Sequence, residues 1–198
     1  MAVTVSFITA LTLFLISFIS GKEQFFLLLN ANGGSIADYF FMIFTYGGDG
    51  LLWIPVLLIT VFILKRKDVF PLLISTFALS TILTQLVKNI IMPGTPRPAK
   101  VITDSLLIHM VKGVEIYKSS SFPSGHTATA FCFYLLFCLL INKRWWFLAG
   151  LIYALLVGYS RVYLAQHFPL DVAAGIIVAI VSTATAVRIQ EYWWKRNR

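Results

Sequence analysis

Long apolar runs without charges recur along the chain, and they constrain the fold more than any other feature. A helix that crosses the hydrocarbon core needs about 20 mostly apolar residues. Six stretches meet or approach that length: Ala2–Ser20, Leu51–Leu64, Val69–Val87, Ser124–Ile141, Trp145–Ser160 and Leu170–Val187. Because lipid offers no partner for backbone polar groups, such runs form helices. The sequence therefore predicts an all-α polytopic membrane bundle with six transmembrane helices.

The composition agrees with a chain that folds inside a membrane. Of the 198 residues, 59% are hydrophobic and 12% are charged, whereas soluble domains average about 45–50% apolar and about 25% charged. This balance excludes an ordinary soluble domain, a disordered chain and a disulfide scaffold. We expect one membrane-embedded domain over residues 1–198. The stretch Phe25–Tyr46 is apolar but interrupted by polar residues, so we expect helices there that lie in the membrane interface after the first span, with a partial re-entrant element as the alternative.

Lysine and arginine gather at alternate junctions between the apolar runs. The clusters comprise Lys65, Arg66, Lys67, Lys143, Arg144, Arg188, Lys195, Arg196 and Arg198. Basic residues collect on the cytoplasmic side of membrane proteins, so both termini are predicted to be cytoplasmic. The same clusters account for the net charge of +8, and no basic run is interleaved with aromatic residues, so we expect no nucleic-acid partner.

Six further ionisable residues lie at the other ends of the apolar runs or in the adjoining loops. They are Lys88, Arg97, His126, Arg161, His167 and Asp171. The orientation derived from the basic clusters assigns all of them to the outer side. Ionisable residues at membrane level are costly and mark functional sites by default. We therefore expect an active site that faces the periplasm or the cell exterior.

One predicted helix start has the features of a phosphate site. Ser124 is a suitable N-cap, and Gly125 allows a ligand to approach the backbone. The free N–H groups and the dipole of a helix N-terminus favour a bound anion. Lys88, Arg97 and Arg161 supply three cations, and arginine can donate two parallel hydrogen bonds to phosphate oxygens.

The two histidines of this region differ in their sequence neighbours. Pro169 suits the first position of a helix, so Asp171 falls in the first turn, where its carboxylate can reach one nitrogen of His167. That contact leaves the other nitrogen of His167 free as a nucleophile. No carboxylate accompanies His126 in the sequence, and we interpret His126 as the general acid that protonates the leaving oxygen.

Three motifs formed by these residues resemble those of the type 2 phosphatidic acid phosphatase (PAP2) superfamily of integral membrane lipid phosphatases. The second motif is complete as Pro123-Ser124-Gly125-His126. The third is complete as Ser160-Arg161, five residues, His167, three residues and Asp171. The first departs from the pattern, because eight residues separate Lys88 from Arg97-Pro98 where the family usually has six. The motif region covers about residues 85–175.

The resemblance implies a metal-independent phosphohistidine mechanism that needs no cofactor. His167 would attack phosphorus with support from Asp171, and His126 would protonate the leaving group and then help to activate water. The phosphoryl oxygens would be held by Lys88, Arg97, Ser124, Gly125 and Arg161. The substrate would be a phosphorylated lipid, and the protein would lie in a bacterial inner or plasma membrane.

The motifs do not choose among undecaprenyl pyrophosphate, phosphatidylglycerophosphate, phosphatidic acid and a lipid A phosphate, and we favour the first. Three other interpretations remain open. A membrane anion or lipid transporter would place its charges near the midplane in repeated halves. A non-catalytic lipid-binding protein would have no need of the nucleophile that the motifs supply. A vanadate-dependent haloperoxidase would have a related anion pocket, but those enzymes are soluble.

Away from the motifs, Asn30, Asp38 and His109 are interpreted as structural or loop residues, and Gly47-Gly48-Asp49-Gly50 as a turn rather than a phosphate loop.

Overall fold

A computed structural model describes residues 1–104, 106–141 and 143–196, and within these ranges every regular element is helical. Arg198 of the C-terminal basic cluster lies outside the described residues. The α-helices are α1 (Ala2–Ile19), α2 (Lys22–Leu29), α3 (Gly34–Phe44), α4 (Trp53–Leu58), α5 (Phe70–Leu86), α6 (Pro98–Val101), α7 (Gly125–Leu140), α8 (Arg144–Tyr163) and α9 (Pro169–Arg196). Short 3₁₀ turns are η1 (Thr45–Gly48), η2 (Gly50–Leu52) and η4 (Lys67–Val69), and π-helical turns are η3 (Ile59–Ile63) and η5 (Val87–Ile91).

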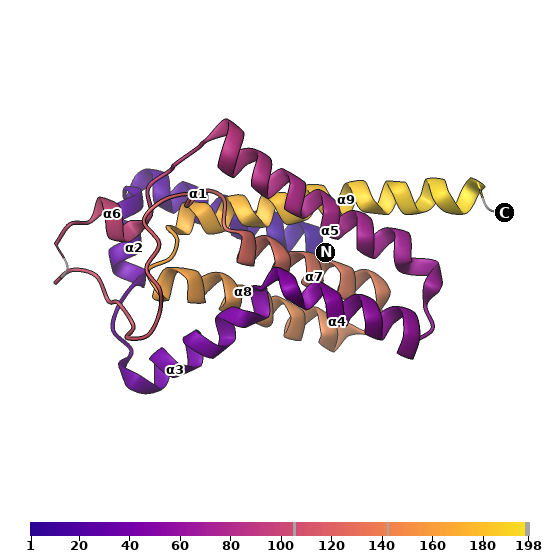
Figure 1. The fold of residues 1–198 in the computed structure, drawn as a ribbon, viewed down its shortest axis with the longest axis horizontal. Helices are drawn as coiled ribbons and strands as arrows, with labels where there is room; N and C mark the ends of the chain where they lie inside the picture. The colour runs from indigo at the N-terminus through magenta and orange to yellow at the C-terminus, as the bar shows by residue number, and fades with distance from the viewer. Residues whose placement is uncertain (105, 142, 197–198) are drawn as a thin grey trace.

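Helix α7 forms the centre of the bundle. Every residue from Thr127 to Leu136 is buried, so apolar and small side chains cover all faces of this helix. It packs against α8 and α9, and α9 also packs against α5 and α1 (Figure 1). A helix that is apolar on all sides is suited to the interior of a bundle, whereas the outer helices keep many large apolar side chains exposed.

The described residues contain four helical stretches that are long and apolar enough to cross a membrane. They are Ala2–Ile19, Lys67–Ile91, Arg144–Tyr163 and Pro169–Arg196. A bent pair, Gly34–Gly48 and Gly50–Ile63, passes the same test as one unit and is either a broken span or a re-entrant loop. Helix α7 is apolar but has only 16 residues. The prediction of an all-helical membrane fold is thereby confirmed, with four or five candidate spans.

The bent pair bears on both interpretations of the N-terminal half. The sequence predicts interfacial helices over Phe25–Tyr46, with a partial re-entrant element as the alternative, and a second span over Leu51–Leu64 that Gly50 and the residues before Asp49 can extend. In the structure, α3 continues through η1 toward α4, and the two halves meet at a bend of 53°. The bend coincides with the Gly47–Gly50 segment, where three glycines weaken helix propagation.

The elements that carry the motifs meet at one end of the bundle. Figure 1 shows α2, α6, the loop before α7 and the turn between α8 and α9 at this end, which we call the motif end. The connection between α4 and α5 and the C-terminal part of α9 lie at the opposite end, which carries the basic clusters. The two charged regions are therefore separated along the long axis of the molecule.

Candidate active site

The motif end brings the predicted ionisable residues into one electrostatic cluster. Lys88 interacts electrostatically with Arg97, Arg161 and Asp171. His126 interacts in the same way with Lys88, Arg97 and Arg161. These side chains come from η5, the loop before α6, the start of α7, the end of α8 and the start of α9. Residues that are up to 83 positions apart in the sequence, from Lys88 to Asp171, thus share one site.

Lys88 belongs to this cluster despite the long spacing of the first motif. It lies in the π-helical turn η5, and the chain then turns through Gly94, whose φ of +68° lies in the left-handed region. A π turn accommodates more residues than an α-helical turn, and such turns are frequent at functional sites. The two additional residues of the first motif are therefore accommodated by η5 and by the turn at Gly94, and Lys88 still interacts electrostatically with Arg97.

The second and third motifs are joined directly by the backbone. The Ser124 N–H donates a hydrogen bond to the Asp171 carbonyl at 3.0 Å. Gly175 allows this close approach of α9, because a Cβ atom there would lie 2.5 Å from the Ser124 carbonyl oxygen. Ser124 also caps α7, and its Oγ accepts hydrogen bonds from the backbone N–H and the hydroxyl of Thr127. The start of α7 is therefore held against the start of α9.

His167 is buried and held by Asp171. Its Nδ1 lies 3.4 Å from Asp171 Oδ2, so the free nitrogen is Nε2 when Nδ1 carries the proton. The same carboxylate oxygen accepts hydrogen bonds from the Ser121 hydroxyl at 2.5 Å and from the Phe168 N–H at 2.9 Å. Burial, opposed by the hydrogen bond and the charge of Asp171, lowers the pKa of His167 to about 3. The imidazole is therefore neutral at physiological pH, as a nitrogen nucleophile has to be.

Arg161 presents an unused donor inside the site. Arg161 is only 7% exposed, and its Nη1 donates to the Thr45 hydroxyl at 2.6 Å. Its Nε is buried and has no hydrogen-bond partner among the described residues. A buried donor without a partner costs free energy unless a ligand satisfies it. The Arg161 carbonyl also accepts the N–H groups of Gln166 and His167, which ties this arginine to the loop of the candidate nucleophile.

Arg97 differs from Arg161 because the protein already uses most of its donors. Its Nε donates to the Ser119 carbonyl at 2.9 Å, and Nη1 donates to the Gln166 carbonyl at 2.9 Å and to its side-chain oxygen at 3.2 Å. A longer contact of 3.4 Å joins Nη2 to the Ser120 carbonyl. Arg97 therefore clamps the loop before α7 onto the loop that carries His167, and it adds positive charge to the site.

Gly125 lies at the free N-terminus of α7 and faces open space. A Cβ atom at this position would meet only Thr84 Cγ2, at an ordinary contact distance of 3.7 Å. Packing therefore does not require glycine here. The open space beside the helix N-terminus agrees with the prediction that a ligand approaches the backbone at this point.

Three residues of the site were not anticipated from the sequence. They are Thr45, Ser121 and Gln166, which contact Arg161, Asp171 and Arg97 respectively. Ser121 and Gln166 are sequence neighbours of the second motif and of His167, and this proximity is a usable signal. Thr45 is separated from Arg161 by more than 100 positions, so no local pattern indicates the contact.

The residues interpreted as structural form a separate network beside the site. The Asn30 side chain donates to the carbonyls of Val162 and Tyr163 at 3.1 and 2.8 Å. Asp38 accepts hydrogen bonds from the Tyr163 hydroxyl at 2.6 Å and from His109 Nε2 at 2.8 Å. These contacts fasten α2, α3 and the loop before α7 to the end of α8, next to Arg161.

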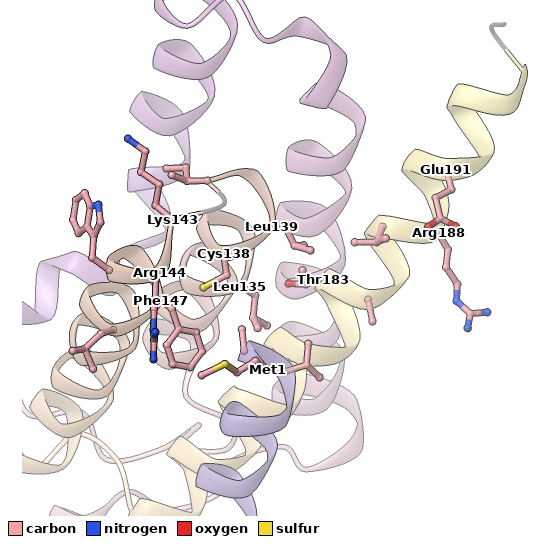
Figure 2. Close-up of a pocket in the computed structure, with 17 residues that line it drawn as sticks. Met1, Leu135, Cys138, Leu139, Lys143, Arg144, Phe147, Thr183, Arg188 and Glu191 are labelled. Atoms are coloured by element: carbon pink, nitrogen blue, oxygen red, sulfur yellow. The ribbon is translucent and has the colours of Figure 1, made fainter.

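A large cavity lies away from the motif end. Among the described residues, no group of three or more His, Cys, Asp or Glu side chains is arranged to hold a metal ion. A cavity of about 1640 Å³ lies at the basic end, between the start of α1, the end of α7, the start of α8 and the second half of α9 (Figure 2). Apolar side chains such as Leu135, Leu139 and Phe147 dominate its wall, and none of the eight predicted site residues lines it.

Comparison with known proteins agrees with the motifs. The family model described as the PAP2 superfamily matches residues 70–195. An undecaprenyl-diphosphatase from Sulfolobus acidocaldarius is 27% identical over 167 residues, which make up 84% of this chain and 77% of that protein. A lipid A 4'-phosphatase from Bacteroides thetaiotaomicron is 27% identical over 174 residues, or 83% of this chain and 75% of that protein. The crystal structure of Aquifex aeolicus LpxE is similar with a TM-score of 0.70 and 32% identity, and the match covers 82% of this chain and 92% of that one.

Proposed function

The chain belongs to the PAP2 superfamily and is a phosphatase of phosphate esters, and from this premise we propose that its substrate is a phosphorylated lipid of the cell envelope. The observation that carries the proposal is the pairing of a buried, neutral His167 with the unsatisfied Nε of Arg161. A transporter or a lipid-binding protein has no need of a nucleophile held by a carboxylate, whereas phosphoryl transfer needs both a nucleophile and donors for the phosphoryl oxygens.

The proposed reaction has two steps. In the first, Nε2 of His167 attacks phosphorus, the bond to the lipid oxygen breaks, and His126 gives its proton to the leaving oxygen. In the second, His126 takes a proton from water, the water oxygen attacks phosphorus, and the bond between phosphorus and His167 breaks to release phosphate. Asp171 keeps Nδ1 oriented and stabilises the positive charge that develops on His167. The products are inorganic phosphate and the lipid without its terminal phosphate, which is the free alcohol from a monophosphate and the lipid monophosphate from a diphosphate.

The phosphoryl oxygens would be bound by donors of Arg161 and Lys88 and by backbone N–H groups at the start of α7. Arg161 offers its Nε, and Lys88 offers a flexible ammonium group. The N–H groups at the start of α7, next to Ser124 and Gly125, offer backbone donors. Arg97 contributes chiefly its charge, because carbonyl groups occupy most of its donors. Such neutralisation of the equatorial oxygens is what phosphoryl transfer requires, and side chains supply it here without a metal ion.

We propose that the protein forms one integral membrane domain with six spans. This count takes the four long helices, the bent pair around η1 and η2 as one broken span, and α7 as a short span. The basic clusters then lie in the cytoplasm with both termini, and the motif end faces the periplasm or the cell exterior. Helix α2, at the motif end, would lie in the outer interface.

Undecaprenyl pyrophosphate is the preferred candidate among the envelope lipids. The undecaprenyl-diphosphatase of S. acidocaldarius matches most of this chain, which supports the choice. Phosphatidylglycerophosphate, phosphatidic acid and a lipid A phosphate share the phosphate group that the motifs bind and remain competitors. A phosphate-release assay on the purified full-length protein with all four lipids in matched detergent micelles will rank them by kcat/KM.

The same assay tests the mechanism. We expect activity to persist in EDTA and to be inhibited by vanadate, which adopts the five-coordinate geometry of the transferring phosphoryl group. Loss of turnover in EDTA with recovery in a divalent metal would contradict the metal-independent reaction. Failure to release phosphate from any of the four lipids, while an aryl phosphate is hydrolysed, would contradict the lipid assignment alone.

A further inference from the structure

The bend between α3 and α4 packs directly against the catalytic helices. Gly48 is buried, and a Cβ atom there would lie 2.7 Å from the His126 carbonyl oxygen and 2.8 Å from His126 Cβ. Gly47 is held from the other side, because the Tyr153 hydroxyl donates a hydrogen bond to its carbonyl. The turn that the sequence did not connect with catalysis is therefore in contact with one of the two histidines of the site.

The same segment also contacts the phosphate-binding side of the site. The Thr45 hydroxyl, at the start of η1, accepts the hydrogen bond from Arg161 Nη1 at 2.6 Å. Thr45 is itself buried, so this contact is shielded from water. Within four residues, the bend thus touches both Arg161 and His126.

Asp49 supplies the only charge of this bend, and it follows Gly48 directly. Its backbone is extended, with φ of −68° and ψ of 135°, and its Oδ1 accepts the Leu51 N–H at 2.8 Å, which caps η2. The carboxylate is half-buried and interacts electrostatically with both His126 and Arg161. The contact of Gly48 with His126 therefore brings the neighbouring carboxylate of Asp49 within electrostatic range of the histidine that has no carboxylate on its own helix.

We infer that Asp49 is a positioning residue of the site, packed beside His126 through the Gly48 contact, and that its charge opposes the surrounding cations and so assists His126 as a general acid. The inference rests on the proposed phosphatase function and assigns to the Thr45–Asp49 bend a part in the active site that no family motif covers. His126 faces the cations Arg161, Lys88 and Arg97, from α8, η5 and the loop before α6. Among the charged groups that act on His126, Asp49 is the one that favours the protonated imidazole over the neutral one.

The different roles of the two histidines explain why a carboxylate is needed near His126. His167 attacks as a neutral nucleophile, so the surrounding cations do not oppose its role. His126 has to carry a proton to the leaving oxygen while it is surrounded by the cations that hold the phosphate. A nearby carboxylate offsets that repulsion, and it does so from a segment that also fixes Arg161 through Thr45.

The test uses Asp49→Asn, which removes the charge and keeps an oxygen that can accept the Leu51 N–H. Asp104→Asn is a matched control, because Asp104 Oδ1 accepts the Leu106 N–H at 2.9 Å in the same local arrangement but is exposed in the loop before α7. Each full-length variant is assayed with phosphatidic acid, a monophosphate whose alkoxide leaving group needs a proton, and with p-nitrophenyl phosphate, whose leaving group does not.

We expect Asp49→Asn to lower kcat for the lipid by on the order of tenfold or more, and kcat for the aryl phosphate by less than about threefold. Asp49→Glu should recover part of the lipid activity, and Asp104→Asn should match the wild type with both substrates. Equal losses with both substrates would assign Asp49 a merely structural role, and no loss with either would remove it from the site. A wild-type protein that hydrolyses neither substrate would instead overturn the proposed function, so the two failures are distinguishable.

Discussion

The two histidines of the site are supported in opposite ways. The carboxylate that faces His167 comes from its own stretch of chain, because Asp171 lies four residues on, and Ser121 hydrogen-bonds to that carboxylate. His126 stands at the first turn of α7 with no acidic residue in that turn, and its carboxylate neighbour arrives from the α3–α4 bend. The proposed nucleophile thus has its carboxylate within its own stretch of chain, whereas the proposed general acid acquires one only through the tertiary fold.

This difference follows from what each residue has to do. A nucleophile needs one fixed tautomer and one free nitrogen, and a single carboxylate one helical turn away achieves both. A general acid needs a proton retained against the cations that bind the substrate. The cations around His126 come from α8, η5 and the loop before α6. The carboxylate that opposes them, Asp49, comes from a fourth element, the α3–α4 bend.

The strongest test of the comparison is His167→Ala. We expect turnover to fall by more than about a thousandfold and no phosphoenzyme to form, because alanine has no nitrogen that can attack phosphorus. Acid-labile phosphate on rapidly quenched protein, located by peptide mapping, measures this directly. Phosphate found on His126, or in the His167→Ala protein, would exchange the two roles.

The second test is His126→Ala. Loss of a general acid typically costs about 10² to 10⁴ in rate, and we expect that range with a lipid substrate. An aryl phosphate should be affected much less in the first step, while hydrolysis of the phosphoenzyme stays slow, so phosphohistidine should accumulate. Equal losses for both substrates, with no accumulation, would show that His126 acts in binding alone.

The contrast between the histidines also shows what the sequence could predict. The helical class, the capping Ser124 and the pair His167–Asp171 depend on residues within a few positions of one another, and periodicity and spacing are sufficient to find them. Electrostatic convergence of Lys88, Arg97 and Arg161 could be expected as well, because the alternation of basic junctions orients every run.

The parts that escaped prediction all depend on contacts between distant segments. The Gly47–Gly50 segment has the composition of a turn, and nothing in it indicates that Gly48 packs on His126 or that Thr45 binds Arg161. Likewise, the polar interruptions of Phe25–Tyr46 left interfacial helices and a partial re-entrant element as alternatives, and the continuation of α3 through η1 into a bent pair with α4 appears only in the folded chain. Arg97 was expected on the phosphate, yet its donors are directed largely to carbonyl groups, which only the folded chain reveals.

The third test concerns the cation shared by both halves of the site. Lys88 interacts electrostatically with Asp171 and with His126, so it can bind a phosphoryl group between the two histidines. We expect Lys88→Ala to cost about 2.7–4 kcal/mol of transition-state stabilisation, as for a lost oxyanion donor. Steady-state kcat/KM with a lipid measures the effect, and Lys112→Ala, which changes an exposed lysine in the loop before α7, is the control. A near-wild-type rate would place Lys88 outside the phosphate site despite its electrostatic contacts.

The smallest expected effect is that of Ser121→Ala, which sharpens the claim that the His167 half is locally built. The Ser121 hydroxyl donates to the Asp171 oxygen that also faces His167 Nδ1, so it restrains the carboxylate without touching the substrate in our proposal. Losing one such hydrogen bond costs about 0.5–1.5 kcal/mol, which corresponds to about two- to tenfold in rate.

That loss should appear in phosphoenzyme formation with p-nitrophenyl phosphate, where the proton from His126 matters little, and it should be of equal size in the His126→Ala background. Independence of this kind is expected if the two histidines are supported by separate sets of contacts. Ser119→Ala is the control, because the side chain of Ser119 is exposed and its carbonyl bond to Arg97 survives the change. An effect of Ser121→Ala that disappears when His126 is absent would show that the two halves are coupled, and the contrast between a locally built nucleophile and an acid assembled by the fold would have to be abandoned.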